Sequence, residues 1–250
     1  IIGKTISQEQ LQAEGFKGIF IASGAGLPNF MNIPGENLVG VMSSNEYLTR
    51  VNLMDAANPE SDTPVLMGKR VAVIGGGNTA MDSVGTARRR GAERAMIVYR
   101  RSEEEMPARS EEVKHAKEEG IEFLTLHNPI EYKGDARGRV THMVLQKMEL
   151  GEPDASGRRK PVVIEGAIEE IEVDEVIVSI GVSPNPLIPQ SFSGLDVTKW
   201  GTIVVNQESM QSAVNHIYAG GDIVRGGATV ILAMGDGRKA AAAMDADLKK

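Results

Sequence analysis

The chain has 250 residues, which indicates one or two domains, and a hydrophobic content of 41% is enough for a sizeable core. Its net charge of −7 argues against nucleic acid or an anionic membrane as a partner. The sequence contains no cysteine, which excludes a disulfide, a cysteine-ligated iron–sulfur cluster and a Cys-x-x-Cys redox pair within it. The four histidines are scattered, so we expect no metal site. No apolar run approaches the ~18 residues of a membrane span, and we expect a cytoplasmic protein.

The first predicted strand covers residues 16–25 and ends in small residues. Small residues at the end of a strand let a ligand come close, although tight packing explains them equally well. A loop with prolines and glycines follows, then a predicted helix over residues 44–52 and a linker over residues 58–64. One strand therefore precedes the next unit and is separated from it by a hinge-like stretch.

A strand, a glycine turn and a helix follow at residues 71–90. Residues 71–74 form the apolar, β-branched run of a strand buried on both faces, and a helix is predicted from residue 78. Between them, Gly75, Gly77 and Ala80 occupy the three small-residue positions of G-x-G-x-x-G/A. Gly75 permits the turn, Gly77 leaves room for a pyrophosphate, and Ala80 keeps the helix close to the sheet. The unpaired N–H groups at the helix start favour phosphate binding.

A second buried strand, over residues 95–99, completes a βαβ unit of about 30 residues. NAD-binding units usually place an acidic residue roughly 20 residues beyond the glycines, where it accepts hydrogen bonds from the ribose 2′-OH. Arg100 and Arg101 stand at that place here. Because guanidinium groups suit a 2′-phosphate, we predict NADP(H) rather than NAD(H). The alternative is that two arginines simply end a strand on a solvated face.

The rest of the central region predicts further α/β structure. A helix is expected from residue 109 or 110 to 120, and a strand over residues 121–126. Residues 140–149 predict a strand that pairs with residues 170–173 across a polar hairpin turn at 151–159. A buried strand over residues 175–181 ends in glycine, and residues 182–186 mark a boundary.

The C-terminal region repeats the strand–glycine–helix pattern. A strand is predicted over residues 203–205, a short strand at 216–222 ends in Gly221 and Asp222, and a helix is predicted over residues 228–239. An aspartate in this position can accept hydrogen bonds from ribityl or ribose hydroxyls, and the helix start can face an anionic or electron-rich ring. The alternative is a turn aspartate followed by a capped helix.

Together these stretches resemble the pyridine nucleotide–disulfide flavoproteins. The branch that they resemble holds the glutamate synthase NADPH small (β) chain and the NADPH- and FAD-binding subunit of ferredoxin–NADP oxidoreductase (sulfide dehydrogenase) complexes. The similar segments are residues 20–25 with 33–36, 75–82, 99–102, 106–109, 180–181 with 184–185, and 218–229. The resemblance implies an α/β fold in which a Rossmann-like NADP(H)-binding domain at 49–185 is inserted into a partial, discontinuous FAD-binding domain at 1–48 and 186–250. The inserted domain would have three layers, with a parallel sheet and an antiparallel β-meander.

The resemblance also implies which residues bind the cofactors NADPH and FAD. The implied groups are Gly75, Gly76, Gly77, Asn78, Thr79 and Ala80 for the NADPH pyrophosphate, Arg100, Arg101 and Arg109 for the 2′-phosphate, Gly181 near the nicotinamide, and Gly221, Asp222, Thr229 and Val230 for FAD. The implied activity is that of an NADPH-dependent oxidoreductase, with hydride transfer from NADPH to FAD and electrons passed to iron–sulfur centres elsewhere. No catalytic side chain is implied, because the protein supplies position and electrostatics while the cofactors react.

Two features of the family are missing from the sequence: an earlier G-x-G-x-x-G turn for the adenine half of FAD, and the upstream cysteines that bind iron–sulfur clusters in many members. We therefore expect a C-terminal fragment that binds NADPH measurably, binds FAD weakly or not at all, and is inactive alone. The implied partners are the missing N-terminal half and a glutamate synthase large subunit or a ferredoxin-type protein. A ferredoxin-coupled subunit and a non-catalytic NADP(H)-binding module remain open alternatives.

Two other classes of oxidoreductase are disfavoured. A short-chain dehydrogenase needs a tyrosine followed by lysine four residues on, and none of the four tyrosines has one. Thioredoxin-reductase activity needs cysteines, and the sequence has none.

Overall fold

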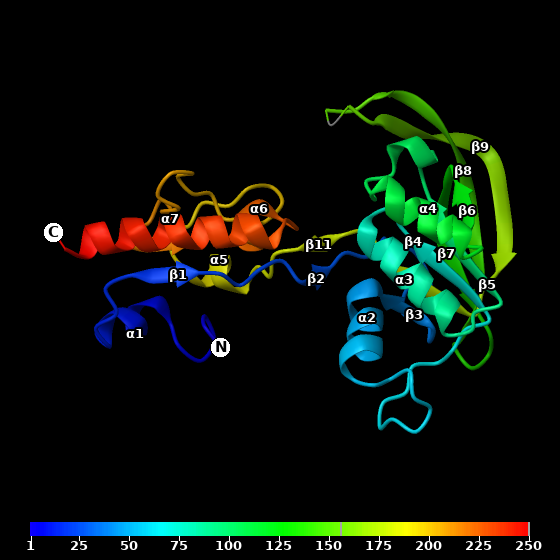
Figure 1. The fold of residues 1–250 in the computed structure, drawn as a ribbon, viewed down its shortest axis with the longest axis horizontal. Helices are drawn as coiled ribbons and strands as arrows, with labels where there is room; N and C mark the ends of the chain where they lie inside the picture. The colour runs from blue at the N-terminus through cyan, green and yellow to red at the C-terminus, as the bar shows by residue number, and fades with distance from the viewer. Residues whose placement is uncertain (156, 250) are drawn as a thin grey trace. The chain divides into compact units, whose positions relative to one another are not determined.

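The computed structural model describes residues 1–155 and 157–249, and the chain divides into two compact units. Unit 1 comprises Ile1–Leu27 and Gly181–Lys250, and unit 2 comprises Pro28–Ile180 (Figure 1). The units divide at 27/28 and 180/181, against the expected 48/49 and 185/186, and β3 (Val41–Ser43) joins the sheet of unit 2. The assignment of the units to FAD and NADP(H) stays a prediction.

Unit 2 is built on a five-stranded parallel sheet with the order β3-β10-β4-β5-β6. Its central strand β4 (Arg70–Ile74) pairs with β5 (Arg94–Tyr99) on one side and with β10 (Glu175–Val178) on the other. β6 (Glu122–Thr125) forms the edge beyond β5, and α3 (Asn78–Arg89) connects β4 to β5. The chain thus adds β5 and β6 on one side of β4 and returns to the other side with β10. In open sheets of this kind, ligands bind at the carboxyl end of the strands where the order reverses, which here is β4.

Helices cover one face of this sheet (Figure 1). They are α2 (Ser44–Leu53), α3 and α4 (Ser110–Glu118), and their buried side chains share a core with alternate residues of the strands, among them Val71 and Val73. Helix α3 contributes Ala80 and Val84, both fully buried. Because strand side chains alternate between faces, the intervening residues of the same strands enter a second core.

An antiparallel meander covers the other face. It consists of β7 (His127–Gly134), β8 (Val140–Pro153) and β9 (Arg159–Glu172), with β8 in the middle. Met143 and Leu145 of β8, both fully buried, pack there with alternate residues of β4, β5 and β10. The predicted three layers, with a parallel sheet and a β-meander, are confirmed.

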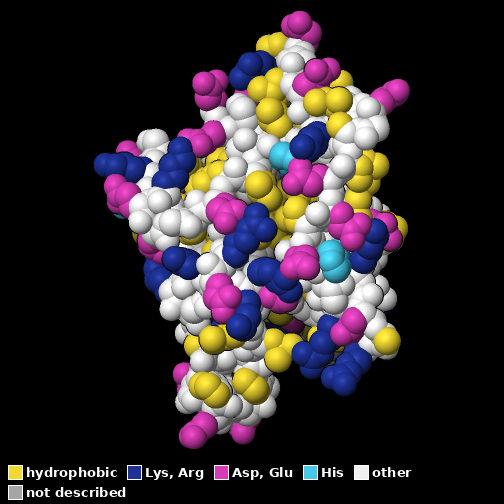
Figure 2. Space-filling view, turned by 90° about the vertical axis from the view of Figure 1, so that its right-hand side faces the viewer, with side chains coloured by type: hydrophobic (Ala, Val, Ile, Leu, Met, Phe, Trp, Pro, Cys, Tyr) yellow, Lys and Arg dark blue, Asp and Glu magenta, His cyan; other side chains and the backbone are white. Residues whose placement is uncertain are grey.

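The outward side of the meander carries both charged and apolar side chains (Figure 2). Lys147 and Glu169 form an ion pair at 3.0 Å between β8 and β9. Val163 and Ile168 of β9 are 52% and 57% exposed. Exposed ion pairs of this kind contribute about 0–1 kcal/mol each, so the hydrophobic core beneath the meander holds it in place.

Unit 1 contains a two-stranded parallel sheet of β1 (Ile19–Ile21) and β12 (Ile217–Ala219). Helix α7 (Val230–Leu248) follows, and Thr229 caps it by accepting a hydrogen bond from the Leu232 N–H. The remaining short elements of the described chain are α1 (Gln8–Ala13), β2 (Leu27–Pro28), η1 (Glu103–Glu105), β11 (Val182–Ser183), α5 (Leu187–Ser191) and α6 (Asp222–Arg225). No helix in the described residues has the length and apolar character needed to cross a membrane.

Two expectations for unit 1 differ from the structure. The predicted strand at 203–205 makes only isolated bridges, Val197 with Ile203 and Val205 with Ser212. Its apolar run reflects burial in an irregular segment, because Ile203 is 1% exposed and enters the core of unit 1. The C-terminal helix starts two residues later than predicted and continues to Leu248 rather than ending at residue 239.

Candidate dinucleotide-binding site

The glycine turn lies at the carboxyl end of β4. Gly75 has a φ of +141°, and a Cβ built there would lie 2.2 Å from the Ser179 carbonyl oxygen. A Cβ at Gly76 would lie 2.9 Å from the Tyr99 ring. Packing within unit 2 therefore requires glycine at both positions.

Gly77 is different, because packing does not require it. Its φ of −94° and ψ of 176° suit any residue, and a Cβ there would meet no atom closer than Pro107 Cγ at 4.0 Å. Gly77 is also the N-cap of α3 and supplies no side chain to cap the helix. Asn78 and Thr79, in the first turn, are exposed, whereas Ala80 is fully buried in the core. The start of α3 is thus open on its outer side, as phosphate binding at a helix N-terminus requires.

The segment after β5 connects the expected arginines with this turn. The Ala108 N–H donates to the Gly76 carbonyl at 3.0 Å, and the Arg109 N–H donates to Asn78 Oδ1 at 2.9 Å. Arg100 and Arg109 are exposed. Arg101 is not: it is 6% exposed and bonded to the β8–β9 hairpin. The structure therefore brings Arg109 to the glycine turn and leaves Arg100 on the surface, while Arg101 turns away from solvent.

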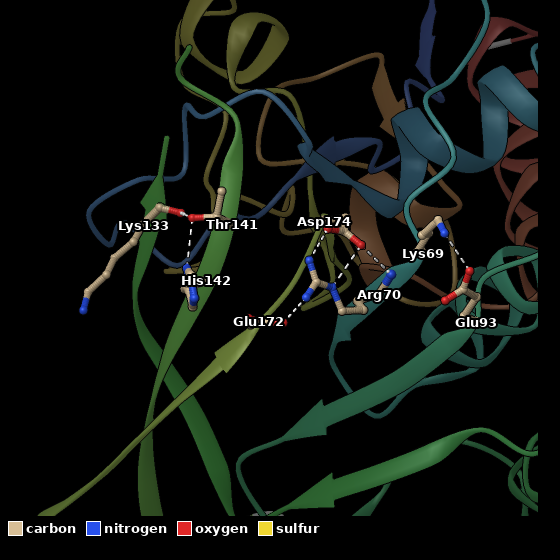
Figure 3. Close-up of polar contacts among 8 residues, drawn as sticks. All are labelled: Lys69, Arg70, Glu93, Lys133, Thr141, His142, Glu172 and Asp174. Atoms are coloured by element: carbon tan, nitrogen blue, oxygen red, sulfur yellow. Dashed lines mark hydrogen bonds and ion pairs between the residues drawn. The ribbon is translucent and has the colours of Figure 1, made fainter. Parts of the chain in front are cut away.

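The opposite end of the sheet is fixed by ion pairs. Arg70, at the start of β4, donates from Nη2 to Asp174 at 2.7 Å and also pairs with Glu172, while Lys69 pairs with Glu93 at 2.9 Å (Figure 3). The Arg70 guanidinium holds the pKa of the Asp174 carboxyl below its usual range. The Arg70–Asp174 pair joins the start of β4 to the residue before β10, and the Lys69–Glu93 pair joins it to the residue before β5.

Sequence reasoning did not single out Glu175, the first residue of β10. Its side chain is buried beside Tyr47 and Arg90 and accepts a hydrogen bond from the Gly68 N–H at 3.1 Å. Burial raises the pKa of Glu175 to about 7. The position lies at the amino end of the sheet, away from the glycine turn, and the only sequence signal is a charge that opens an apolar strand.

A second site lies within unit 1, in a cleft of about 280 Å³. Its walls are the segment after β1, the turn after β12 and the start of α7, and it is lined by Phe20, Ala22, Gly24, Gly220, Gly221, Asp222, Ala228, Thr229, Val230 and Ala233. The four residues expected to bind FAD all line this cleft, as do Ala22 and Gly24, two of the small residues that end the first predicted strand. Gly181 is exposed, adopts a φ of +100° and is not among the lining residues.

Asp236 of α7 supports the turn of this cleft and was not expected from the sequence. Its side chain is 1% exposed and accepts from the Gly221 N–H at 3.1 Å. The Arg225 guanidinium donates to both of its oxygens, at 2.7 and 2.5 Å. This pairing lowers the pKa of Asp236. Asp222 itself bonds to the Ala228 N–H at 3.1 Å, which shapes the loop before α7. The described residues contain no group of three His, Cys, Asp or Glu side chains that could hold a metal ion.

A chain that combines a parallel sheet carrying a glycine turn at its reversal point with a second unit containing a strand–glycine–helix cleft has the architecture of a dinucleotide-binding oxidoreductase. The family model of the pyridine nucleotide-disulphide oxidoreductases matches residues 3–237, and the chain belongs to this family. The predicted family and fold class are therefore confirmed.

The relatives are similar over most of this chain. It is 39% identical to a putative glutamate synthase [NADPH] small chain of Cereibacter sphaeroides, over 96% of this chain and 58% of that protein. It is 37% identical to the glutamate synthase [NADPH] small chain of Azospirillum brasilense, over 99% of this chain and 52% of that protein. The structure of Mycobacterium tuberculosis FprA in complex with NADPH superposes with a TM-score of 0.77 at 22% identity, over all of this chain and 67% of that one. The chain spans about half the length of the curated relatives it matches.

Proposed function

We propose that the chain supplies the NADPH-binding part of an NADPH-dependent flavoprotein oxidoreductase of the glutamate synthase small chain type. The observation that carries the proposal is the opening at Gly77. A backbone position that packing leaves free stands beside an uncapped helix start, at the reversal point of a parallel sheet. A pyrophosphate can approach this backbone, and its charge is favoured by the first N–H groups of α3.

The residues around the turn have separate roles in this proposal. Gly75 and Gly76 form the turn, Gly77 admits the pyrophosphate, and Asn78 and Thr79 flank it on the first turn of α3. The 2′-phosphate is assigned to the arginines after β5, with Arg109 held next to the turn through Asn78. Gly181 is assigned to the nicotinamide half.

The unit 1 cleft fits part of a flavin dinucleotide. Asp222 offers a carboxylate for hydroxyls, and Thr229 and Val230 begin a helix whose N-terminus can face the ring. Its volume of about 280 Å³ is close to the lower end of the roughly 300–1,000 Å³ of ordinary ligand pockets, and these residues would hold part of FAD. When bound, FAD would supply the hydride acceptor and pass electrons to iron–sulfur centres of a partner. The partner is proposed to be a glutamate synthase large subunit or a ferredoxin-type protein.

Binding titrations of the 250-residue chain test the proposal. We expect measurable NADPH binding, weaker NADH binding, and weak or no FAD binding. Replacing Arg100 and Arg101 together with alanine should flatten the preference for NADPH over NADH, because Arg109 would then be the only one of the three assigned guanidinium groups left. Equal discrimination by this double variant and the parent, or tight binding of FAD, would contradict the proposal.

A non-catalytic NADP(H)-binding module is the second candidate, because the open glycine turn of unit 2 would hold a nucleotide whether or not a flavin reacts with it. The two candidates differ in flavin content and in the response of the flavin to NADPH. An oxidoreductase would be yellow and would lose its colour on addition of NADPH, whereas a binding module would show neither property.

A further inference from the structure

The two adjacent arginines after β5 have different surroundings. Arg100 is exposed, whereas Arg101 is 6% exposed. The Arg101 guanidinium donates from Nε to the Arg159 carbonyl at 2.8 Å and from Nη2 to Asp154 Oδ2 at 2.7 Å. Both acceptors lie at the tip of the β8–β9 hairpin, where β8 ends and β9 begins. Arg101 is thus paired within the protein and turned away from solvent.

The same hairpin tip also holds the turn that follows the arginines. The Arg159 side chain donates from Nε to Glu105 Oε1 at 2.6 Å, and it reaches Glu104 at 3.3 Å. Glu105 is 8% exposed and also accepts a hydrogen bond from the Ser102 hydroxyl. One side chain of β9 therefore fixes η1, only a few residues beyond the expected phosphate ligands.

The far end of this segment is attached to the glycine turn. Ala108 bonds to the Gly76 carbonyl and Arg109 bonds to Asn78. The segment from residue 100 to residue 109 is therefore tied at one end to the hairpin tip and at the other to the start of α3. A displacement of the hairpin tip would shift the exposed arginines relative to the turn.

We propose that the hairpin tip positions the 2′-phosphate pocket, with Arg101 as a positioning residue held by Asp154 and the Arg159 carbonyl, and with Arg100 and Arg109 as the cations that contact the phosphate. The inference rests on the proposed binding of NADPH at the glycine turn. Its physical basis is competition: a carboxylate and a phosphate use the same guanidinium donors. To contact a phosphate, the Arg101 guanidinium would have to leave both the partly buried Asp154 carboxylate and the Arg159 carbonyl.

Removing the charge of Asp154 distinguishes a positioning residue from a phosphate ligand. If Arg101 were a ligand, the Asp154→Asn variant would free its guanidinium and tighten NADPH binding. If Arg101 positions the segment from residue 100 to residue 109, the same variant weakens the attachment of this segment to the hairpin tip. We then expect NADPH affinity to fall about threefold, with little change in NADH affinity. The readout is the ratio of the NADPH and NADH affinities, because a general loss of structure would weaken the binding of both nucleotides alike.

The experiment is a set of NADPH and NADH titrations on the full chain and its variants. Arg100→Ala should lower the NADPH/NADH affinity ratio roughly tenfold, since it removes a charge-assisted contact. Asp154→Asn should have no further effect in an Arg101→Ala background, because the two groups act through one contact. Arg101→Lys, which keeps the charge but loses the planar fork, serves if Arg101→Ala unfolds and should resemble Asp154→Asn. Glu170→Gln is the matched control, because it breaks an ion pair with Lys133 elsewhere on the same meander and should leave the ratio unchanged.

Two results separate this inference from the proposed function. A parent chain that prefers NADPH, with an Asp154→Asn variant that binds NADPH more tightly than the parent, overturns the inference alone. A parent chain with no preference for NADPH overturns the proposed function and the inference with it. Reduced NADPH selectivity in both Arg100→Ala and Asp154→Asn, with the control unchanged, supports both.

Discussion

Replacing Gly77 with alanine separates binding from folding at the glycine turn. The backbone at Gly77 already has a conformation that alanine adopts, and the new methyl group would meet no atom within 4 Å except Pro107 Cγ at that distance. Restricting the unfolded chain should then raise the free energy of unfolding by about 0.4–1 kcal/mol, while alanine is a poorer N-cap than glycine and should cost a similar amount. We therefore expect the variant to be about as stable as the parent.

Binding of NADPH, by contrast, should weaken. The methyl group would occupy the place from which a pyrophosphate reaches the N–H groups at the start of α3. Losing one charge-assisted hydrogen bond costs about 1.5–3 kcal/mol, which corresponds to roughly a 10- to 100-fold weaker NADPH affinity. Denaturant unfolding and an NADPH titration on the same preparation would measure the two effects.

Gly75→Ala is the matched comparison. Its methyl group would lie 2.2 Å from the Ser179 carbonyl oxygen, at a φ of +141°. Overpacking costs about 1–3 kcal/mol and the backbone conformation about as much again, so this variant should lose stability before binding can be assessed. Unchanged NADPH affinity in Gly77→Ala would refute the placement of the pyrophosphate, and equal stability of Gly75→Ala and the parent would refute the packing argument.

Three further variants test other parts of the structure. The raised pKa of Glu175, about 7 against 4.5, means that the folded chain keeps a proton that the unfolded chain releases, so stability falls as pH rises through this window. Glu175→Gln should remove this loss and stabilise the protein at pH 8 by up to about 3 kcal/mol, with little change at pH 4; a pH-independent difference in thermal melts would contradict the assignment. Asp236→Asn leaves Arg225 without its carboxylate, and unfolding at pH 7 should show a loss of about 2–4 kcal/mol. Because the pKa of Asp236 is lowered, this difference should shrink as pH falls below the usual carboxyl value of 3.8, and a constant difference down to pH 2 would count against the ion pair. Asn78→Ala removes the hydrogen bond from the Arg109 N–H and should cost about 1 kcal/mol of stability together with part of the preference for NADPH over NADH. Calorimetric titration with both nucleotides measures this preference, and an unchanged preference would contradict the role given to Asn78.

The central strands and the glycine turn were predictable because their signals are local. β4, β5 and β10 are buried on both faces, so each reads as a short apolar run, and the turn between β4 and α3 has its glycines within a few residues. The order of the strands was not predictable in this way, since β10 reaches its place beside β4 only through long-range pairing.

Elements that depend on distant partners were missed or shortened. β3 has only three residues and is a strand because β10 pairs with it. β9 runs over Arg159–Glu172, although only residues 170–173 were expected to pair, because its side chains are mostly exposed and give no apolar pattern. Pairing with β8 decides its length.

The arginines after β5 show the same division at the level of single residues. The sequence alone determined that two guanidiniums follow the second strand of a βαβ unit, and hence the expected nucleotide. The sequence could not distinguish one arginine from the other. Neighbouring side chains of an extended segment point in opposite directions, and the groups that each one meets come from distant parts of the chain. Only the tertiary structure placed Asp154, 53 residues further along the chain, against Arg101 and left Arg100 in solvent.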